Sequence, residues 1–403
     1  MSKRWWIAAL LATATAINYL DRQNLPVAIS EIQKTIPVSD TQYSQLQFLF
    51  LLAYGAMYAV GGWLLDLLGV RWGYALMIVW WSAANALHGL AGTVTQLGVV
   101  RFALGLGEGG GFPGSAKAVA EWFGVEERAF AFGLFNTGSS VGAVIAPPLI
   151  AAIVTSLGWR WVFLITGGLG FAWAALWATV YHTPPGSFAA KAAPQPKWGA
   201  LLRDGRVRGM CTAKLLGDSA WYFFIFWLPK YLADVRHLNI KQIGYYAWIP
   251  YAFAGAGSLF GGWFSGYLIR RGWGVVSSRK LCLAISASLL PASLFITTSP
   301  VALAIVFFSM AMFGHQFWST IIQTLSADLF PPEAVGSVTG LVGASGSFGG
   351  MLFNLAVGAM LSAFGGYGPV FLVAGLLHPV SVIVVFLTRL EQRPVRSQIG
   401  AIA

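Results

Sequence analysis

Residues 334–388 read AVGSVTGLVGASGSFGGMLFNLAVGAMLSAFGGYGPVFLVAGLLHPVSVIVVFLT, a run of 55 residues without Asp, Glu, Lys or Arg. A membrane-spanning helix needs roughly 20 apolar residues, because a helix rises about 1.5 Å per residue and the hydrocarbon core is about 30 Å thick. The run is therefore long enough for two spans. The turn-forming sequence FGGYG, at 364–368, lies between them, so this stretch predicts a hairpin of two membrane helices.

The composition of the whole chain agrees with the prediction of membrane helices. Of the 403 residues, 57% are hydrophobic and 10% are charged, whereas about a quarter are charged in an ordinary soluble domain. This excludes a soluble enzyme, a disordered chain and a secreted disulfide scaffold. Cys211 and Cys282 both lie in apolar runs, say nothing about disulfides and make no metal site.

The remaining charge-free stretches extend the pattern over the chain. Five of them fit one span each, and a sixth, 281–327, fits two that are separated by Thr298-Ser299-Pro300. Three further apolar segments carry charges inside them. The single-span stretches are 41–65, 72–100, 129–159, 161–190 and 242–269, and the charged segments are 5–30, 95–120 and 208–232. The sequence therefore predicts an all-α membrane protein with twelve transmembrane helices.

The one long polar stretch is the proline-rich segment 183–207, which divides the chain into an N-terminal half, 1–182, and a C-terminal half, 208–403, of six spans each. The halves echo each other: Gly61-Gly62-Trp63 returns as Gly261-Gly262-Trp263, and such internal repeats indicate a duplicated unit. Two parallel six-helix halves with a substrate site near the midplane describe the major facilitator architecture.

The basic residues indicate how the chain is oriented. The net charge of +11 comes from Lys and Arg that lie mostly at the two ends, in 183–207 and in alternate short loops. The opposite loops hold Lys34, Arg160, Lys230, Arg236 and Lys241. Because basic residues accumulate on the cytoplasmic side, both termini are expected there, in a bacterial-type inner membrane. The charge is topological, so nucleic acid is not an expected partner. The first segment carries Asp21-Arg22 and is too long for a cleaved signal peptide.

Ionisable residues inside the expected spans are costly and point to function. They are confined to the first, fourth, seventh and tenth spans. They are Asp21 and Arg22, then Arg101, Glu108 and Lys117, then Lys214 and Asp218, and finally His315. These four spans begin the four three-helix units of the chain, and in the major facilitator architecture such helices line the central cavity.

Spacing predicts how the charges of the N-terminal half are arranged. Arg101 and Glu108 are seven residues apart and share one helix face. Asp21 and Arg22 are adjacent and point about 100° apart, so they cannot both face one ligand. We expect Arg22 to face the cavity and Asp21 to face the fourth span, where it would interact with Arg101.

The chemistry of these residues suggests roles. A carboxyl in a low-dielectric cavity can carry a proton near neutral pH, and Glu108 is the best candidate because the glycines around it let another helix approach closely. Arg22 offers a planar fork that suits a carboxylate. The run GLGEGG at 105–110 imitates a dinucleotide-binding loop, but it follows no strand.

In the C-terminal half, Lys214 and Asp218 are four residues apart and can pair directly. They form either a structural ion pair or part of a binding site, since buried pairs often serve no binding role. His315 is a single histidine in an apolar helix and is either a packing residue or a ligand contact. The residue types alone leave both alternatives open.

The sequence resembles two nested families. Gly62-Trp63-Leu64-Leu65-Asp66-Leu67-Leu68-Gly69-Val70-Arg71 is similar to the loop signature of the major facilitator superfamily, in which Gly62, Asp66, Gly69 and Arg71 are the structural positions. The copy in the second half, 262–266, has lost the acid. Further stretches resemble the anion:cation symporter family in its hexuronate branch: 18–22, 101–113, 121–128, 136–148, 218–230, 278–280, 315–316 and 326–328.

This resemblance implies a role for each matching residue. Arg22 would bind the substrate carboxylate, Asp21 and Glu108 would bind protons, and Arg101 would be linked to that relay. The positions that match sugar-contacting residues of the family are Tyr19, Tyr54 and Ser139 in the N-terminal half and Lys214, Trp221, His315 and Gln316 in the C-terminal half. Gly343 stands where galactonate-type relatives have an asparagine, which favours a hexuronate over an aldonate.

We therefore expect a monomeric symporter, not an enzyme, that imports a sugar-acid anion with protons and needs no cofactor or metal. The substrate would bridge the two halves, with Trp221 against its ring. An aldonate or other organic-anion symporter, antiporter or uniporter of the same fold is the main alternative. A membrane receptor or membrane enzyme is a remote one, because the sequence has no nucleophile triad, metal cluster or large extramembrane domain.

Overall fold

The computed structural model describes residues 3–123, 125–184, 198–330, 332–388 and 390. Across these residues the chain is helical and contains no strand. It forms two compact units: unit 1 comprises residues 1–191 and 225–249, and unit 2 comprises 192–224 and 250–403. The division at 183–207 into two halves stays a prediction, and most of that segment, 185–197, lies outside the described residues.

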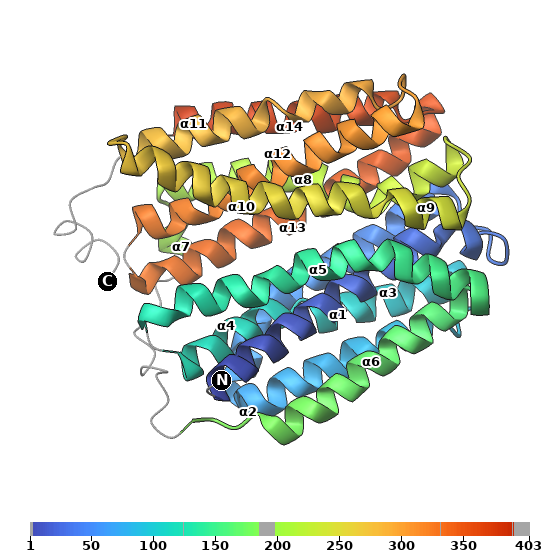
Figure 1. The fold of residues 1–403 in the computed structure, drawn as a ribbon, viewed down its shortest axis with the longest axis horizontal. Helices are drawn as coiled ribbons and strands as arrows, with labels where there is room; N and C mark the ends of the chain where they lie inside the picture. The colour runs from blue at the N-terminus through green and yellow to red at the C-terminus, as the bar shows by residue number, and fades with distance from the viewer. Residues whose placement is uncertain (1–2, 124, 185–197, 331, 389, 391–403) are drawn as a thin grey trace. The chain divides into compact units, whose positions relative to one another are not determined.

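Unit 1 is built from six helices of the N-terminal part and a short one from later in the chain. They are α1 (Lys3–Ile32), α2 (Asp40–His88), α3 (Val94–Glu108), α4 (Gly111–Trp122), α5 (Val125–Leu157), α6 (Trp159–Val180) and α9 (Ile240–Tyr246). Helix α2 packs against α3 and α6, and α1 packs against α5 and α6. Figure 1 shows these long helices lying side by side.

Unit 2 contains the remaining helices. They are α7 (Trp198–Leu201), most of α8 (Gly205–Asp234), α10 (Trp248–Arg270), α11 (Val275–Ala287), the 3-10 helix η1 (Leu290–Phe295), α12 (Val301–Leu329), α13 (Pro332–Phe364) and α14 (Gly368–Leu387). Helix α12 packs against α11, η1 and α13. The predicted breaks are confirmed, because α12 begins directly after Pro300 and the turn between α13 and α14 falls at 365–367.

Glycines break the helical structure at two places in unit 1. In α2 the helix is broken at Gly69, whose φ of 71° and ψ of 158° lie outside the helical range, and this residue separates the spans expected at 41–65 and 72–100. The span expected at 95–120 is divided into α3 and α4 at Gly109 and Gly110. A Cβ on Gly105 would lie 2.3 Å from the Phe50 carbonyl oxygen, which confirms the expected close approach of a neighbouring helix.

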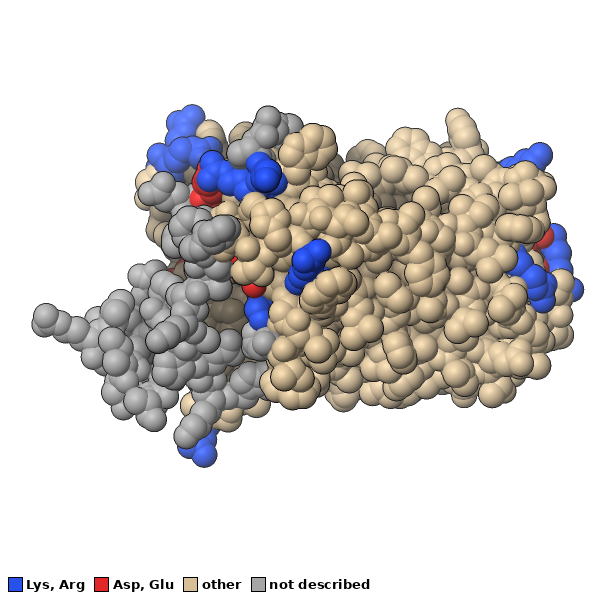
Figure 2. All heavy atoms as spheres, turned by 90° about the horizontal axis from the view of Figure 1, so that it is seen from below, with Lys and Arg blue, Asp and Glu red and all other residues tan. Residues whose placement is uncertain are grey.

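The structure supports a membrane protein, although fewer of its described helices are long and apolar enough to cross a bilayer than the sequence predicts. Within the described residues, six helical stretches are long and apolar enough to cross a membrane: Gly133–Leu157, Trp159–Val180, Val275–Phe295, Val301–Leu329, Ala334–Phe364 and Gly368–Leu387. In the face that Figure 2 shows, Lys, Arg, Asp and Glu gather near the two ends and leave a wide zone with few charges. The count of twelve spans stays a prediction.

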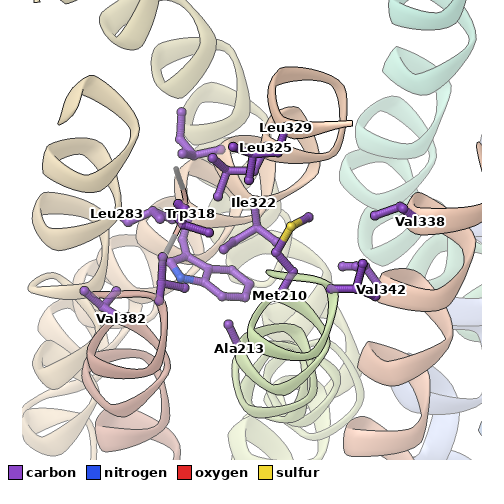
Figure 3. Close-up of a cluster of buried hydrophobic side chains, with 14 of the residues drawn as sticks. Met210, Ala213, Leu283, Trp318, Ile322, Leu325, Leu329, Val338, Val342 and Val382 are labelled. Atoms are coloured by element: carbon purple, nitrogen blue, oxygen red, sulfur yellow. The ribbon is translucent and has the colours of Figure 1, made fainter. Parts of the chain in front are cut away.

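The core of unit 2 lies around Trp318 of α12, which is fully buried. Figure 3 shows its indole among Met210 and Ala213 of α8 and Leu283 of α11. A Cβ on Gly217 would lie 2.4 Å from this indole, so the glycine makes room for the ring. Close packing of this kind holds helices together in a bilayer, because lipid tails are as apolar as the side chains.

Candidate functional site

Two of the predicted site residues form a buried ion pair in unit 1. Arg22 is on α1, and Glu108 is the last residue of α3. The Nε and Nη2 atoms of Arg22 both lie 3.0 Å from Oε2 of Glu108, and the two side chains are 3% and 0% exposed. Within the described part of the chain, Oε1 of Glu108 has no hydrogen-bond partner. The fixed cation and the titratable acid that the sequence singled out are therefore in direct contact.

Aromatic rings surround the Arg22 guanidinium. Its central carbon lies 4.7 Å from the ring centres of both Tyr19 and Tyr54 and 5.4 Å from that of Phe50. The side-chain Oδ1 of Asn18 accepts a further hydrogen bond from Nη2 at 3.2 Å. Cation–π contacts stabilise a guanidinium without neutralising it. The pocket therefore favours a positive charge at Arg22 whether or not Glu108 is ionised.

Asp21 points into a different part of unit 1, and one expectation is corrected here. Its Oδ1 accepts a hydrogen bond of 2.9 Å from Asn85, and Arg101 does not take this place. Asn85 also donates to Thr166 at 2.7 Å and accepts from Asn24 at 3.2 Å. Neutral amides do not stand out in a search for charges, so the sequence reasoning missed them. Their signal is an asparagine inside an otherwise apolar span.

Arg101 is fully buried and links three helices. Its Nη2 donates to Gln47 on α2 at 3.0 Å and to the Arg22 carbonyl oxygen on α1 at 3.3 Å. Its guanidinium lies over the Phe50 ring at 4.6 Å. Within the described residues, its Nε and Nη1 atoms have no hydrogen-bond partner. Arg101 thus contacts the backbone of the residue that pairs with Glu108, and its link to a proton relay stays a prediction.

Other predicted residues of unit 1 lie in different settings. Ser139 on α5 donates to the Asn136 carbonyl oxygen at 2.7 Å. Arg71 of the loop motif donates to the Ala178 carbonyl oxygen at 2.6 Å and so ties α2 to α6. Gly62 lies within α2, and Gly69 forms its kink. The side chain of Asp66 is outside the described part of the structure.

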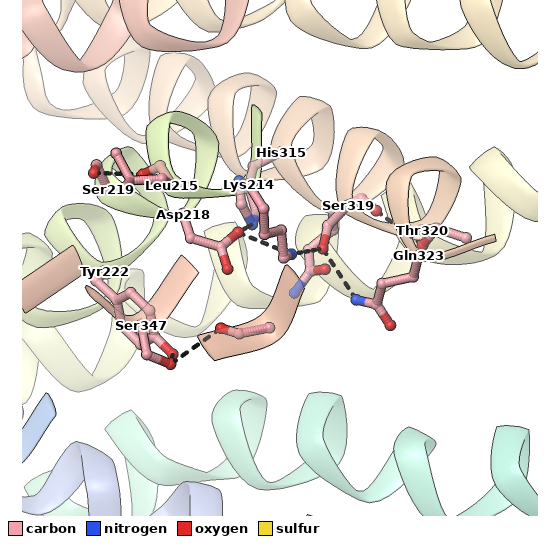
Figure 4. A network of polar contacts seen from close by, with 12 residues as sticks. Lys214, Leu215, Asp218, Ser219, Tyr222, His315, Ser319, Thr320, Gln323 and Ser347 are labelled. Carbon is pink, nitrogen blue, oxygen red and sulfur yellow. Dashed lines mark hydrogen bonds and ion pairs between the residues drawn. The ribbon is translucent and has the colours of Figure 1, made fainter. Parts of the chain in front are cut away.

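Unit 2 holds a second buried polar cluster, drawn in Figure 4. The predicted pairing within α8 is confirmed, since Nζ of Lys214 lies 2.9 Å from Oδ1 of Asp218. Lys214 also donates to Ser319 of α12 at 2.7 Å. Nε2 of His315 lies 3.8 Å from the same Asp218 oxygen. A Cβ on Gly346 of α13 would lie 2.1 Å from the other carboxyl oxygen, so the carboxylate packs directly on that glycine.

His315 is packed and hydrogen bonded within unit 2, as the packing alternative has it, and its contact with a ligand stays a prediction. Trp221 of α8 stacks on its ring at 4.7 Å with an interplanar angle of 8°. Its Nδ1 lies 2.9 Å from Nε2 of His378 on α14. Trp221 and Gln316 are half-buried, whereas His315 is 1% exposed. The sequence analysis did not single out His378, because it sits alone in an apolar helix.

In the second-half copy of the loop motif, another helix supplies the carboxylate that the motif itself lacks. Gly266 of α10 stands where the first copy has an acid. The hydroxyl of the preceding residue, Ser265, accepts a hydrogen bond of 2.5 Å from Arg279. Asp328, at the end of α12, lies 2.8 Å from Arg279. The charge that is missing from the motif is thus supplied from about 60 residues further along the chain.

Comparison with known proteins identifies the family of the chain. A family model for the Major Facilitator Superfamily matches residues 11–354 and, in a second overlapping match, 273–402. The hexuronate transporter of Escherichia coli (strain K12) is 32% identical, and the alignment covers 97% of this chain and 95% of that one. The galacturonate transporter of Dickeya chrysanthemi is 33% identical, over 74% of this chain and 92% of that one.

A solved structure shows the same fold. It is a bacterial homologue of the human lysosomal transporter Spinster in an inward-facing, occupied conformation, which aligns with a TM-score of 0.74 at 18% identity over 96% of each chain. The chain therefore belongs to the major facilitator superfamily, and it is a multi-pass membrane transporter rather than an enzyme, as its sequence predicts.

Proposed function

We propose that this protein is a proton-coupled symporter that imports a hexuronate anion across a bacterial inner membrane by alternating access. The names of its hexuronate- and galacturonate-transporting relatives support the substrate class. The observation that carries the coupling is the buried ion pair of Arg22 and Glu108. Twelve spans, cytoplasmic termini and a monomeric state belong to the same proposal.

The coupling follows from charge balance at this pair. Arg22 and Glu108 together are neutral, and breaking a buried pair by removing one partner costs about 3–5 kcal/mol. A proton that arrives alone neutralises Glu108 and leaves the charge of Arg22 without a carboxylate to balance it, and an anion that arrives alone faces the carboxylate of Glu108. When both arrive, Glu108 is neutralised and the substrate carboxylate takes its place on Arg22. The net charge stays the same, so joint binding avoids both penalties.

Asp21 provides a second proton site. Its carboxyl is fully buried and is hydrogen bonded by the amide of Asn85, and an amide stabilises an ionised carboxyl less than a cation does. Importing one anion against an inside-negative potential costs about 2.3 kcal/mol per 100 mV. One proton offsets that cost, and a second makes the import favourable. Two carboxyls therefore suit accumulation of an anion.

The unit 2 cluster would contact the sugar hydroxyls. Lys214, Asp218, Ser319 and His315 offer donors and acceptors in one place, and Trp221 and the Gln316 side chain are half-buried beside them on the same helices. Tyr19, Tyr54 and Ser139 are the corresponding contacts from unit 1. Gly343, in place of an asparagine, favours a hexuronate over an aldonate.

The test is uptake of labelled galacturonate and glucuronate into proteoliposomes, with and without an imposed inward proton gradient. We expect accumulation that collapses when a protonophore is added. Exchange without accumulation would instead indicate an antiporter or uniporter. Absence of transport of any organic anion by folded protein would refute the proposal. If only a non-sugar anion competed for uptake, the substrate assignment would change and the assignment as a transporter would stand.

A further inference from the structure

His378, and the contact that it makes with His315, have no role in the proposal so far. His378 of α14 is fully buried, and its ring lies 5.1 Å from that of His315 at an angle of 83°. The indole of Trp318 covers it at 5.0 Å. A buried, edge-on contact of 2.9 Å between two ring nitrogens is a hydrogen bond and not simple packing.

The surroundings decide which ring donates. Two neutral imidazoles form such a bond only when one nitrogen carries a hydrogen and the other offers a lone pair. Nε2 of His315 faces Oδ1 of Asp218 at 3.8 Å, and a lone pair there would face a negative oxygen. Nε2 of His315 therefore carries its hydrogen, and Nδ1 accepts. It follows that Nε2 of His378 is the donor.

The remaining nitrogen of His378 agrees with this assignment. Within the described residues, Nδ1 of His378 is buried without a hydrogen-bond partner. In the assigned tautomer this atom is a lone pair and not an N–H group. An orphaned buried acceptor is more readily tolerated than an orphaned buried N–H. The opposite tautomer would bury an unsatisfied donor and also turn a lone pair of His315 toward Asp218.

We propose that His378 is a positioning residue that fixes His315 as a hydrogen-bond donor and so makes unit 2 selective for a hydroxylated anion. The separation of 3.8 Å between Nε2 of His315 and Oδ1 of Asp218 is too long for a direct bond. A substrate hydroxyl that lies to one side of these two atoms, within hydrogen-bond distance of both, would accept from His315 and donate to Asp218. This inference rests on the proposed function, since it assumes that a sugar acid reaches unit 2.

The first measurement is the ¹⁵N spectrum of the histidine side chains in the unaltered protein. The chain has five histidines, so His315 and His378 are assigned by single substitutions. We expect both rings to carry their hydrogen on Nε2. A hydrogen on Nδ1 of His315 would overturn the inference regardless of any transport result. Hexuronate uptake by the same protein tests the proposed function separately, so the two failures are distinguishable.

The second measurement compares two variants of the same residue. His378→Gln keeps an N–H donor near the position of Nε2, whereas His378→Phe keeps the ring and removes the donor. We expect His378→Phe to raise the half-saturating hexuronate concentration about tenfold, with the maximal rate little changed. Discrimination against a monocarboxylate without hydroxyls should fall by a similar factor. His378→Gln should stay within about twofold of the unaltered protein, and so should the exposed control His182→Phe.

Two outcomes would contradict the role of His378. In one, His378→Phe retains both the half-saturating concentration and the discrimination, so the donor is not needed. In the other, the Gln and Phe variants lose binding equally while the tautomer of His315 is unchanged, which indicates a packing role alone. Rescue by Gln together with a changed ¹⁵N signature of His315 in the Phe variant is the result that supports positioning.

Discussion

Each unit of the molecule has a buried pair of a cation and a carboxylate among the predicted site residues, and the two pairs are built differently. Arg22 and Glu108 lie on separate helices, 86 residues apart in sequence. Lys214 and Asp218 lie one turn apart on the same helix. A pair within one helix stays together however that helix moves. A pair between helices can separate, and its arginine keeps a stabilising aromatic pocket when it does. We infer that unit 1 responds to protons and that unit 2 is a fixed platform for the sugar.

The largest effect should come from removing the cation of the pair in unit 1. Arg22→Ala deletes the proposed carboxylate partner, and truncating one side of a buried charge pair costs about 3–5 kcal/mol, which corresponds to more than a hundredfold in affinity. We expect no measurable hexuronate binding by calorimetry. Arg22→Lys keeps the charge without the planar fork and should bind weakly. Near-normal binding by Arg22→Ala would show that the anion binds elsewhere.

A second pair of variants separates the roles of the two carboxyls. Glu108→Gln imitates the protonated acid, so it should abolish proton-driven accumulation while exchange of labelled for unlabelled substrate continues. Asp218→Asn should instead weaken binding and leave the dependence on the proton gradient intact. Both are measured in proteoliposomes with counterflow and gradient-driven uptake. The contrast between the units fails if Asp218→Asn uncouples uptake, or if Glu108→Gln loses exchange as well.

Much of this contrast could be predicted from the sequence, and the reasons are physical. A charge inside an apolar run is visible without a structure, so Arg22, Glu108 and Lys214 stood out at once. Pairing across one helical turn follows from spacing alone, and the pairing of Lys214 with Asp218 is confirmed. The fold class followed from the charge-free runs and their glycine and proline breaks.

The site contacts that the sequence did not predict are contacts between different helices. The partner of Asp21 is Asn85, from a helix that no local pattern connects to it. His378 is one neutral residue in an apolar helix, and only the packing of α12 and α14 gives it a partner. Such contacts join neutral groups that are distant in sequence. Neither periodicity nor a charge count reports them, so the sequence identified the charged residues and missed the amides and the histidine that surround them.

A smaller effect should come from filling the space against Asp218. Gly346→Ala places a Cβ 2.1 Å from the present position of a carboxyl oxygen of Asp218, which must then move. We expect the half-saturating hexuronate concentration to rise about tenfold, with the dependence on protons retained. Gly340 lies on the same helix with open space at its Cβ, so Gly340→Ala is the matched control. Equal behaviour of the two variants would show that the position of this carboxylate does not matter for binding.

The smallest effect should come from the neutral partner of the unit 2 cation. Ser319→Ala removes the hydrogen bond of 2.7 Å from Lys214 and leaves the ion pair of Lys214 with Asp218. It also removes a bond of 3.2 Å from Gln323, which is exposed and can bond to water instead. A single such bond contributes about 1 kcal/mol, so we expect a rise of about fivefold in the half-saturating concentration, measured by initial uptake rates. Ser288→Ala, which removes an exposed hydroxyl at the C-cap of α11, should change nothing. Because the pair within α8 survives, proton-driven accumulation should persist in Ser319→Ala. If that variant lost accumulation as Glu108→Gln is expected to, unit 2 would take part in proton coupling and would not be the fixed platform inferred here.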